Sequence, residues 1–163
     1  MFKKIAFAVP MAVLSLSSAV AFAADDARTS INISATIPSK VFHAQPRDPN
    51  FGVDEKMAYD LAKGTLSPLR ATYDVRHTSG GVGAYVEGGP QPLSNGLSTI
   101  ALTYTFNGVT LTEKSQEVVT EALAKPGTQV ELVIAAAKPT DTQYGEFNAT
   151  PIVIFDAMAS VTP

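Results

Sequence analysis

Cysteine is absent from the 163-residue sequence. This absence excludes disulfides, thiol catalysis, cysteine metal sites and a lipid-modified amino-terminal cysteine. Histidine is scarce as well, with two residues in the chain. The sequence also lacks a Gly-x-Ser-x-Gly elbow, a phosphate-binding glycine loop and a His-Glu-x-x-His zinc helix. We therefore predict no enzymatic activity, no cofactor and no metal, and expect stability to come from packing and strand pairing alone.

The amino-terminal 23 residues have the three parts of a secretory signal peptide. Two lysines stand near the start, residues 5–23 carry no charge, and an Ala-Phe-Ala triplet supplies the small residues of a cleavage site. A membrane anchor is the alternative, because nineteen uncharged residues nearly span a bilayer. Pro10 and several serines weaken such a span. The pattern favours export and a mature chain that begins near Ala24.

The mature chain has the size and charge of one acidic domain. Removal of residues 1–23 leaves 140 of the 163 residues, about the length of an ordinary domain. Both lysines of the signal leave with it, so ten basic side chains remain against fifteen acidic ones, a net charge of −5. This charge argues against nucleic acid as a partner.

Short apolar runs with a period of two dominate the mature chain and predict an all-β, antiparallel sandwich or barrel. The runs lie at residues 69–77, 82–86, 100–106, 130–136 and 152–158. Asn107-Gly108 between two runs is a strong hairpin signal, because a type I′ turn requires positive φ at both central residues. The last run is apolar on both faces over residues 152–155, which is typical of a central strand. Residues 114–125 are predicted as a short helix, and residues 45–52 as a loop.

Residues 30–37 form a further strand pattern, directly after the signal region. Its apolar face consists of Ile31, Ile33, Ala35 and Ile37. This strand either opens its own sandwich or leaves it to complete the sheet of another molecule. At the other end of the chain, the five residues after Met158 are too few to turn back and pair with the last strand. If that last strand lies at the rim, it is open to a strand from another copy, in a head-to-tail contact that grows into a filament.

Four segments resemble the major pilins of CFA/I-type (class 5) fimbriae. They are Ile-Asn-Ile-Ser-Ala-Thr-Ile at 31–37, Tyr-Asp-Val-Arg-His-Thr at 73–78, Glu-Leu-Val-Ile-Ala-Ala-Ala-Lys-Pro at 131–139, and Tyr-Gly-Glu-Phe-Asn-Ala at 144–149. They follow the family's order over most of the mature chain, whose length matches a major subunit rather than a two-domain tip adhesin. The resemblance implies an incomplete immunoglobulin-like antiparallel sandwich, which a donor strand from a neighbouring subunit completes.

The resemblance also implies the division of the chain and its partners. Residues 1–23 are then a signal peptide, 24–38 an amino-terminal donor-strand extension, and 39–163 the immunoglobulin-like pilin domain. The implied donor residues are Ile31, Ile33, Ala35 and Ile37, and the implied acceptor groove is lined by Ile152, Val153, Ile154 and Phe155. Expected partners are neighbouring copies, a periplasmic chaperone, an outer-membrane usher and a tip adhesin. The expected function is that of a structural major subunit, exported through the periplasm, of a cell-surface fimbria that polymerises by donor-strand exchange and supports adhesion.

A different class of function stays open from the residues alone. A self-contained secreted or periplasmic β-sandwich that binds a carbohydrate or a protein is the alternative, and a hydrolase on such a scaffold is a more distant one. Tyr59, Tyr85 and Tyr144 are candidate sugar contacts. Isolated tyrosines near strand ends, however, more often pack against a sheet or cap it.

The remaining titratable residues favour structural roles. His77 falls on the apolar face of its strand, so we predict a packed, hydrogen-bonded imidazole, whereas His43 is predicted to be a solvated turn residue. Asp48, Asp54 and Glu55 have the chemistry to bind a hard cation, but their spacing matches no calcium loop. We therefore predict that they form a solvated acidic rim.

Overall fold

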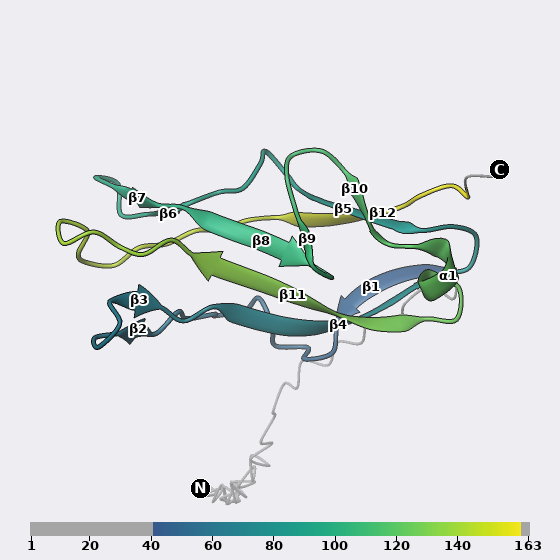
Figure 1. The fold of residues 1–163 in the computed structure, drawn as a ribbon, viewed down its shortest axis with the longest axis horizontal. Helices are drawn as coiled ribbons and strands as arrows, with labels where there is room; N and C mark the ends of the chain where they lie inside the picture. The colour runs from purple at the N-terminus through teal and green to yellow at the C-terminus, as the bar shows by residue number, and fades with distance from the viewer. Residues whose placement is uncertain (1–40, 161–163) are drawn as a thin grey trace, which may run out of the picture. The chain divides into compact units, whose positions relative to one another are not determined.

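The computed structural model describes residues 41–160, whose strands form two antiparallel sheets packed face to face (Figure 1). The larger sheet has the order β1-β4-β11-β8-β9 and the smaller one β10-β5-β12. The larger sheet contains β1 (Phe42–Pro46), β4 (Leu69–His77), β11 (Thr128–Ala136), β8 (Leu102–Phe106) and β9 (Val109–Thr110). The smaller sheet contains β10 (Gln116–Val119), β5 (Val82–Val86) and β12 (Val153–Ala157). Two small hairpins and one helical turn complete the described part, namely β2 (Tyr59–Asp60) with β3 (Thr65–Leu66), β6 (Leu93–Ser94) with β7 (Thr99–Ile100), and α1 (Glu121–Ala124).

The period-two runs of the sequence become strands with one buried face, as predicted. In β4, Ala71, Tyr73, Val75 and His77 are buried, while the residues between them are exposed or half-buried. β11 alternates in the same way and pairs antiparallel with β4, so that Leu132 lies opposite Ala71. Alternation arises because successive side chains of a strand point to opposite faces of the sheet.

The predicted hairpin at Asn107-Gly108 joins β8 to β9. Asn107 has φ 51° and Gly108 has φ 79°, so both central residues occupy the left-handed region. Asparagine and glycine are the residues that tolerate this conformation best, and the turn then follows the twist of the two strands.

Two local predictions are wrong. Most of residues 114–125 is not helical, because Gln116–Val119 is strand β10, paired with β5, and only Glu121–Ala124 forms a helical turn. Val118 and Val119 are both buried there, and β-branched side chains suit a sheet better than a short isolated helix. The predicted loop at 45–52 also starts too early, since β1 extends to Pro46. Proline is tolerated at that position because β1 is an edge strand of its sheet.

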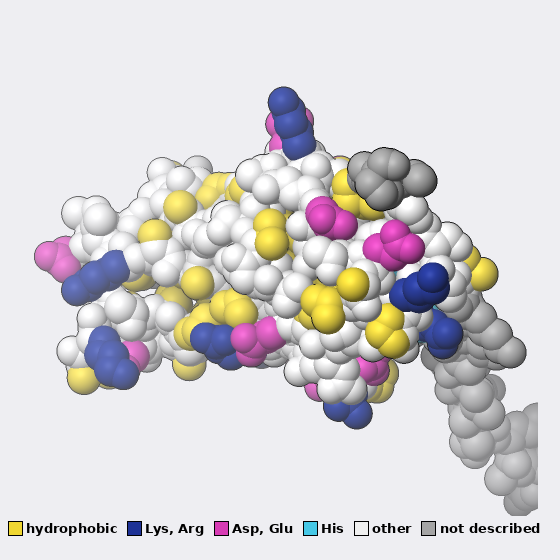
Figure 2. Space-filling model, turned by 45° about the vertical axis from the view of Figure 1, so that its right-hand side comes forward, with side chains coloured by type: hydrophobic (Ala, Val, Ile, Leu, Met, Phe, Trp, Pro, Cys, Tyr) yellow, Lys and Arg dark blue, Asp and Glu magenta, His cyan; other side chains and the backbone are white. Residues whose placement is uncertain are grey.

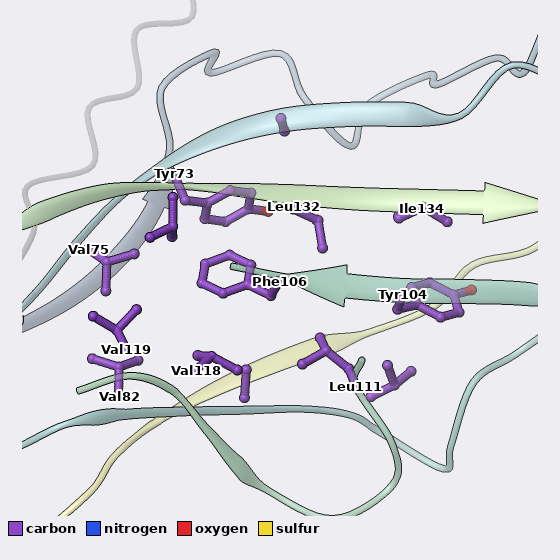
Figure 3. Packing of buried hydrophobic residues seen from close by; sticks show 14 of the residues in the cluster. Tyr73, Val75, Val82, Tyr104, Phe106, Leu111, Val118, Val119, Leu132 and Ile134 are labelled. Atoms are coloured by element: carbon purple, nitrogen blue, oxygen red, sulfur yellow. The ribbon is translucent and has the colours of Figure 1, made fainter. Parts of the chain in front are cut away.

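The core lies between the two sheets, where their inner side chains interdigitate (Figure 3). The largest fully buried side chains come from strands of both sheets and from the segment after β9: Tyr104, Phe106, Leu111, Leu132, Val75, Val82, Val86 and Val119. This arrangement is an immunoglobulin-like antiparallel sandwich, and the predicted fold class is confirmed. No helix within residues 41–160 has the length and apolar content to cross a membrane.

The two ends of the sandwich are formed by different strand termini. The α1 end contains the carboxyl end of β4 at His77, the start of β5 at Val82 and the last residue of β12, which lies opposite Val82. The β2–β3 end contains the start of β4 at Leu69 and the start of β12 at Val153. In Figure 1 the β2–β3 hairpin and α1 lie at opposite ends of the strands.

Candidate functional site

Strand β12 is apolar on both faces over residues 153–155 and carries Asp156 on its outer face, yet within residues 41–160 it pairs with a single strand. Its partner is β5, in an antiparallel register that places Val153 opposite Val86 and Phe155 opposite Ala84. It therefore forms one edge of the smaller sheet in the described part of the chain. This corrects the prediction of a central strand, because an apolar pattern reports burial of both faces and does not report how many neighbours a strand has.

Next to β12 an open cavity of about 1480 Å³ reaches down to the inner face of the larger sheet. We call this cavity the groove. Its floor includes Tyr73, Leu132 and Ile134, which belong to β4 and β11. The lining also includes Val153 and residues from the segments 51–66 and 139–151, among them charged side chains. Tyr73, Leu132 and Ile134 are themselves buried, so the groove ends at the outer boundary of the core.

An aromatic cluster extends from the groove into the core. The Phe155 ring lies 5.5 Å from the Tyr73 ring and 4.9 Å from the Phe106 ring, measured between centroids. Phe51 packs edge-on against Tyr73 at 6.3 Å. Burial raises the pKa of the Tyr73 hydroxyl, because the phenolate loses its solvation. Phe155 nevertheless keeps part of its surface exposed, as does Val153, although both contact the core.

The four predicted acceptor residues do not share one face of the strand. Val153 and Phe155 point toward the core, opposite the buried residues of β5, and Val153 lines the groove. Ile154 lies opposite Tyr85 on the other face, and Ile152, which precedes the strand, is 52% exposed. The structure thus brings two of the four residues toward the core. The predicted donor residues Ile31, Ile33, Ala35 and Ile37 lie outside the described residues.

Sequence reasoning missed the contribution of β1. Phe42 and Ala44 lie opposite His77 and Val75 on the inner face of the larger sheet, and both are half-buried against the core. A signal was available in the apolar alternation of Phe42 and Ala44, but it spans too few residues to predict a strand by itself. On the face seen in Figure 2, hydrophobic side chains likewise reach the surface between charged ones.

The histidines have structural positions. His77 is 6% exposed, its Nδ1–H donates to the Gly81 carbonyl at 2.9 Å, and its ring meets Phe42 edge-on at 5.6 Å. The predicted packed, hydrogen-bonded imidazole is confirmed. The prediction for His43 is wrong, because this residue is half-buried within β1, opposite Arg76, and not in a turn.

The acidic residues after β1 interact with groups of the same loop. Asp48 accepts a hydrogen bond from the Asn50 backbone N–H at 2.9 Å, and Glu55 accepts one from Gly52 at 3.1 Å. Asp54 pairs with Lys56 at 3.2 Å, with both side chains largely exposed. Within residues 41–160 no group of three or more His, Asp or Glu side chains is placed to hold a metal ion.

Two of the three candidate sugar-contacting tyrosines lie at the mouth of the groove. Tyr59 is 53% exposed and Tyr144 is 82% exposed, and both line the groove. Tyr85 is half-buried on β5, opposite Ile154.

Comparison with known proteins places the chain in a family. Residues 27–156 match the family model of the CS1 type fimbrial major subunit. Among solved structures, the chain is similar to the CooA pilin subunit from enterotoxigenic Escherichia coli, with 17% sequence identity and a TM-score of 0.43. That match covers 66% of this chain and 88% of the other. No curated protein matches. Because the family model covers most of the sequence, the chain belongs to the CS1-type fimbrial major subunits and is a structural subunit of a pilus.

Proposed function

We propose that this subunit polymerises by donor-strand exchange. Residues 24–38 of one copy form an extension, and its strand at 30–37 pairs with the free edge of β12 in the next copy. The observation that carries the proposal is an apolar strand with one paired neighbour in the described residues, beside an open groove of about 1480 Å³. An exposed apolar edge of this kind is normally covered or paired.

The donor pattern suits this groove chemically. Ile31, Ile33, Ala35 and Ile37 present one apolar face, which would cover the partly exposed Val153 and Phe155. Burial of each isoleucine is expected to contribute roughly 1.5–3 kcal/mol. Each ladder hydrogen bond with the open edge of β12 adds about 0.5–1.5 kcal/mol. Ordering of the extension opposes these gains by about 1–2 kcal/mol per residue of backbone entropy.

The same proposal covers assembly and location. Residues 1–23 direct export, a periplasmic chaperone protects the open groove, and an outer-membrane usher exchanges the chaperone for the extension of the next subunit. Residues 39–163 form the pilin domain of a cell-surface fibre with an adhesin at its tip. The fibre supports cell adhesion, and this subunit has a structural rather than an enzymatic role.

The test compares two versions of the mature protein, one native and one with a copy of residues 29–38 joined through a short flexible linker after Pro163. The proposal predicts that the extended version is a monomer with a melting temperature higher by about ten degrees or more, while the native version polymerises. Size-exclusion chromatography and calorimetry measure both properties. A third version, with Ile33→Asp in the appended strand, is expected to lose the gain, because an unpaired charge would be buried against the apolar floor of the groove.

A matched control distinguishes the effect of burying a charge from the effect of adding a charge anywhere on the appended strand. Asn32→Asp in the appended strand adds the same carboxylate to the opposite, polar face, and it is expected to keep most of the stabilisation. Equal stability of native and extended monomers would contradict the proposal. The described sandwich would then need no further strand, and the binding-module interpretation would replace it.

A further inference from the structure

The direction of the inserted strand follows from where the chain leaves its own domain, provided that subunits join by the proposed donor-strand exchange. The Thr78 backbone N–H donates to the Val41 carbonyl at 2.9 Å, which places the start of the described domain at the α1 end. β12 also finishes there, where the Met158 N–H donates to the Gly81 carbonyl at 3.0 Å. A copy's own extension therefore departs from the α1 end.

A donor parallel to β12 would finish at this same α1 end. The departing extension and the incoming neighbour would then compete for one place, and copies could not stack end to end. A donor antiparallel to β12 finishes instead beside Val153, at the β2–β3 end. Antiparallel pairs are also about two to three times commoner than parallel ones.

The connection between the donor strand and its own domain is short, so the domains of two successive copies must lie close together. Three residues separate Ile37, the last donor residue, from Val41. Four Cα–Cα steps span at most about 14 Å. The α1 end of the donating copy must therefore lie against the β2–β3 end of the accepting copy.

The β2–β3 end carries several exposed apolar side chains. Leu61 is 90% exposed, Tyr144 is 82% exposed and Tyr59 is 53% exposed, and all three line the groove at its mouth. We call them the mouth patch. The opposite end presents Leu123 of α1, which is 50% exposed. Exposed apolar side chains that gather at one site mark a contact surface.

We infer that the mouth patch is a second contact between successive subunits, separate from the strand joint, and that it seats the α1 end of the next copy around Leu123. The contact is heterologous, because two different surfaces meet, and it therefore propagates along a fibre. It would fix the angle between neighbouring domains.

The absence of native cysteine permits a direct test in assembled fibres. The variant Leu61→Cys/Leu123→Cys is expressed as the full chain with its assembly partners and oxidised mildly. We expect a ladder of covalent multimers that survives boiling in detergent and disappears on reduction, with at least tenfold more dimer than in a control variant. The control is Thr72→Cys/Leu123→Cys, because Thr72 is an exposed residue on the outer face of β4.

A second readout covers the case in which the cysteine variant does not assemble. Leu123→Ser alone, on α1 and outside the groove, is expected to give fibres with unchanged resistance to unboiled detergent but a shorter persistence length in electron micrographs. If the variants form fibres normally, give no ladder and keep their stiffness, the mouth patch is not a contact between subunits. Donor-strand exchange would be unaffected by that result. Covalent dimers from Leu123→Cys alone, without longer products, would instead indicate that two α1 ends meet and would likewise overturn the inference about the mouth patch. If the unmodified chain does not form detergent-resistant fibres, the proposal of donor-strand exchange is wrong. The inference about the mouth patch, which rests on that proposal, is then wrong as well.

Discussion

Phe155 provides the sharpest quantitative test of an incompletely covered core. Its ring packs against Tyr73 and Phe106, at 5.5 and 4.9 Å between centroids, but part of it stays exposed on the same face of β12 as the groove-lining Val153. Truncation of a fully buried phenylalanine to alanine costs about 3–5 kcal/mol. For Phe155→Ala in the native mature protein we expect about 2–3 kcal/mol, because part of the apolar surface is already in water. In the version with the appended donor strand the cost should rise to about 3–5 kcal/mol, since the strand would bury the rest of the ring.

Guanidinium unfolding of the four proteins, each purified and diluted until size-exclusion chromatography shows a monomer, measures this difference of about 1 kcal/mol or more. Leu111→Ala is the control, because Leu111 is fully buried and does not line the groove. It should cost the same in both versions, within about 0.5 kcal/mol. An identical cost of Phe155→Ala in both versions would refute the reasoning, since the appended strand would then not cover this ring.

Three further outcomes are expected. Val153→Thr places a hydroxyl in the groove and should weaken the joints between subunits, whereas Ile154→Thr on the other face of β12 should not. The detergent resistance of fibres made from the two variants measures this difference. The raised pKa of the buried Tyr73 means that the folded chain keeps a phenolic proton which the unfolded chain releases above about pH 10. Stability should therefore fall as pH rises beyond about 10, and less steeply in Tyr73→Phe, as chemical unfolding at about pH 9 and pH 11 will record. Gly80→Ala should destabilise the domain, because the new methyl group would collide with the Met158 carbonyl oxygen; an unchanged melting temperature would exclude that contact.

The long strands and the hairpin follow from local sequence. In β4 and β11 each residue's face is fixed by the pleat, so the alternation of apolar and polar residues reports which face is buried. Asn107-Gly108 specifies its turn through the positive φ that those two residues tolerate. The packed state of His77 was also predictable, because its place in the alternation puts it on the buried face.

Short elements depended on their partners. β1 contains five residues and ends in proline, and it is a strand because β4 pairs along its whole length. β10 has a helix-like sequence context, but pairing with β5 and burial of Val118 and Val119 outweigh a local preference that is weak over so few residues.

By itself the sequence determined an acidic, cysteine-free chain with all-β patterning, it predicted export and an apolar strand pattern at 30–37, and its motifs were sufficient to suggest the pilin family. Only the tertiary structure decided that β12 lies at a sheet edge in the described residues, that Val153 and Phe155 rather than Ile152 and Ile154 point toward the core, and that β1 contributes to the same inner face. The physical reason is that burial of a face leaves a periodic signature along the chain. Which strands become neighbours, and which edge stays open, depends on pairing between residues far apart in sequence.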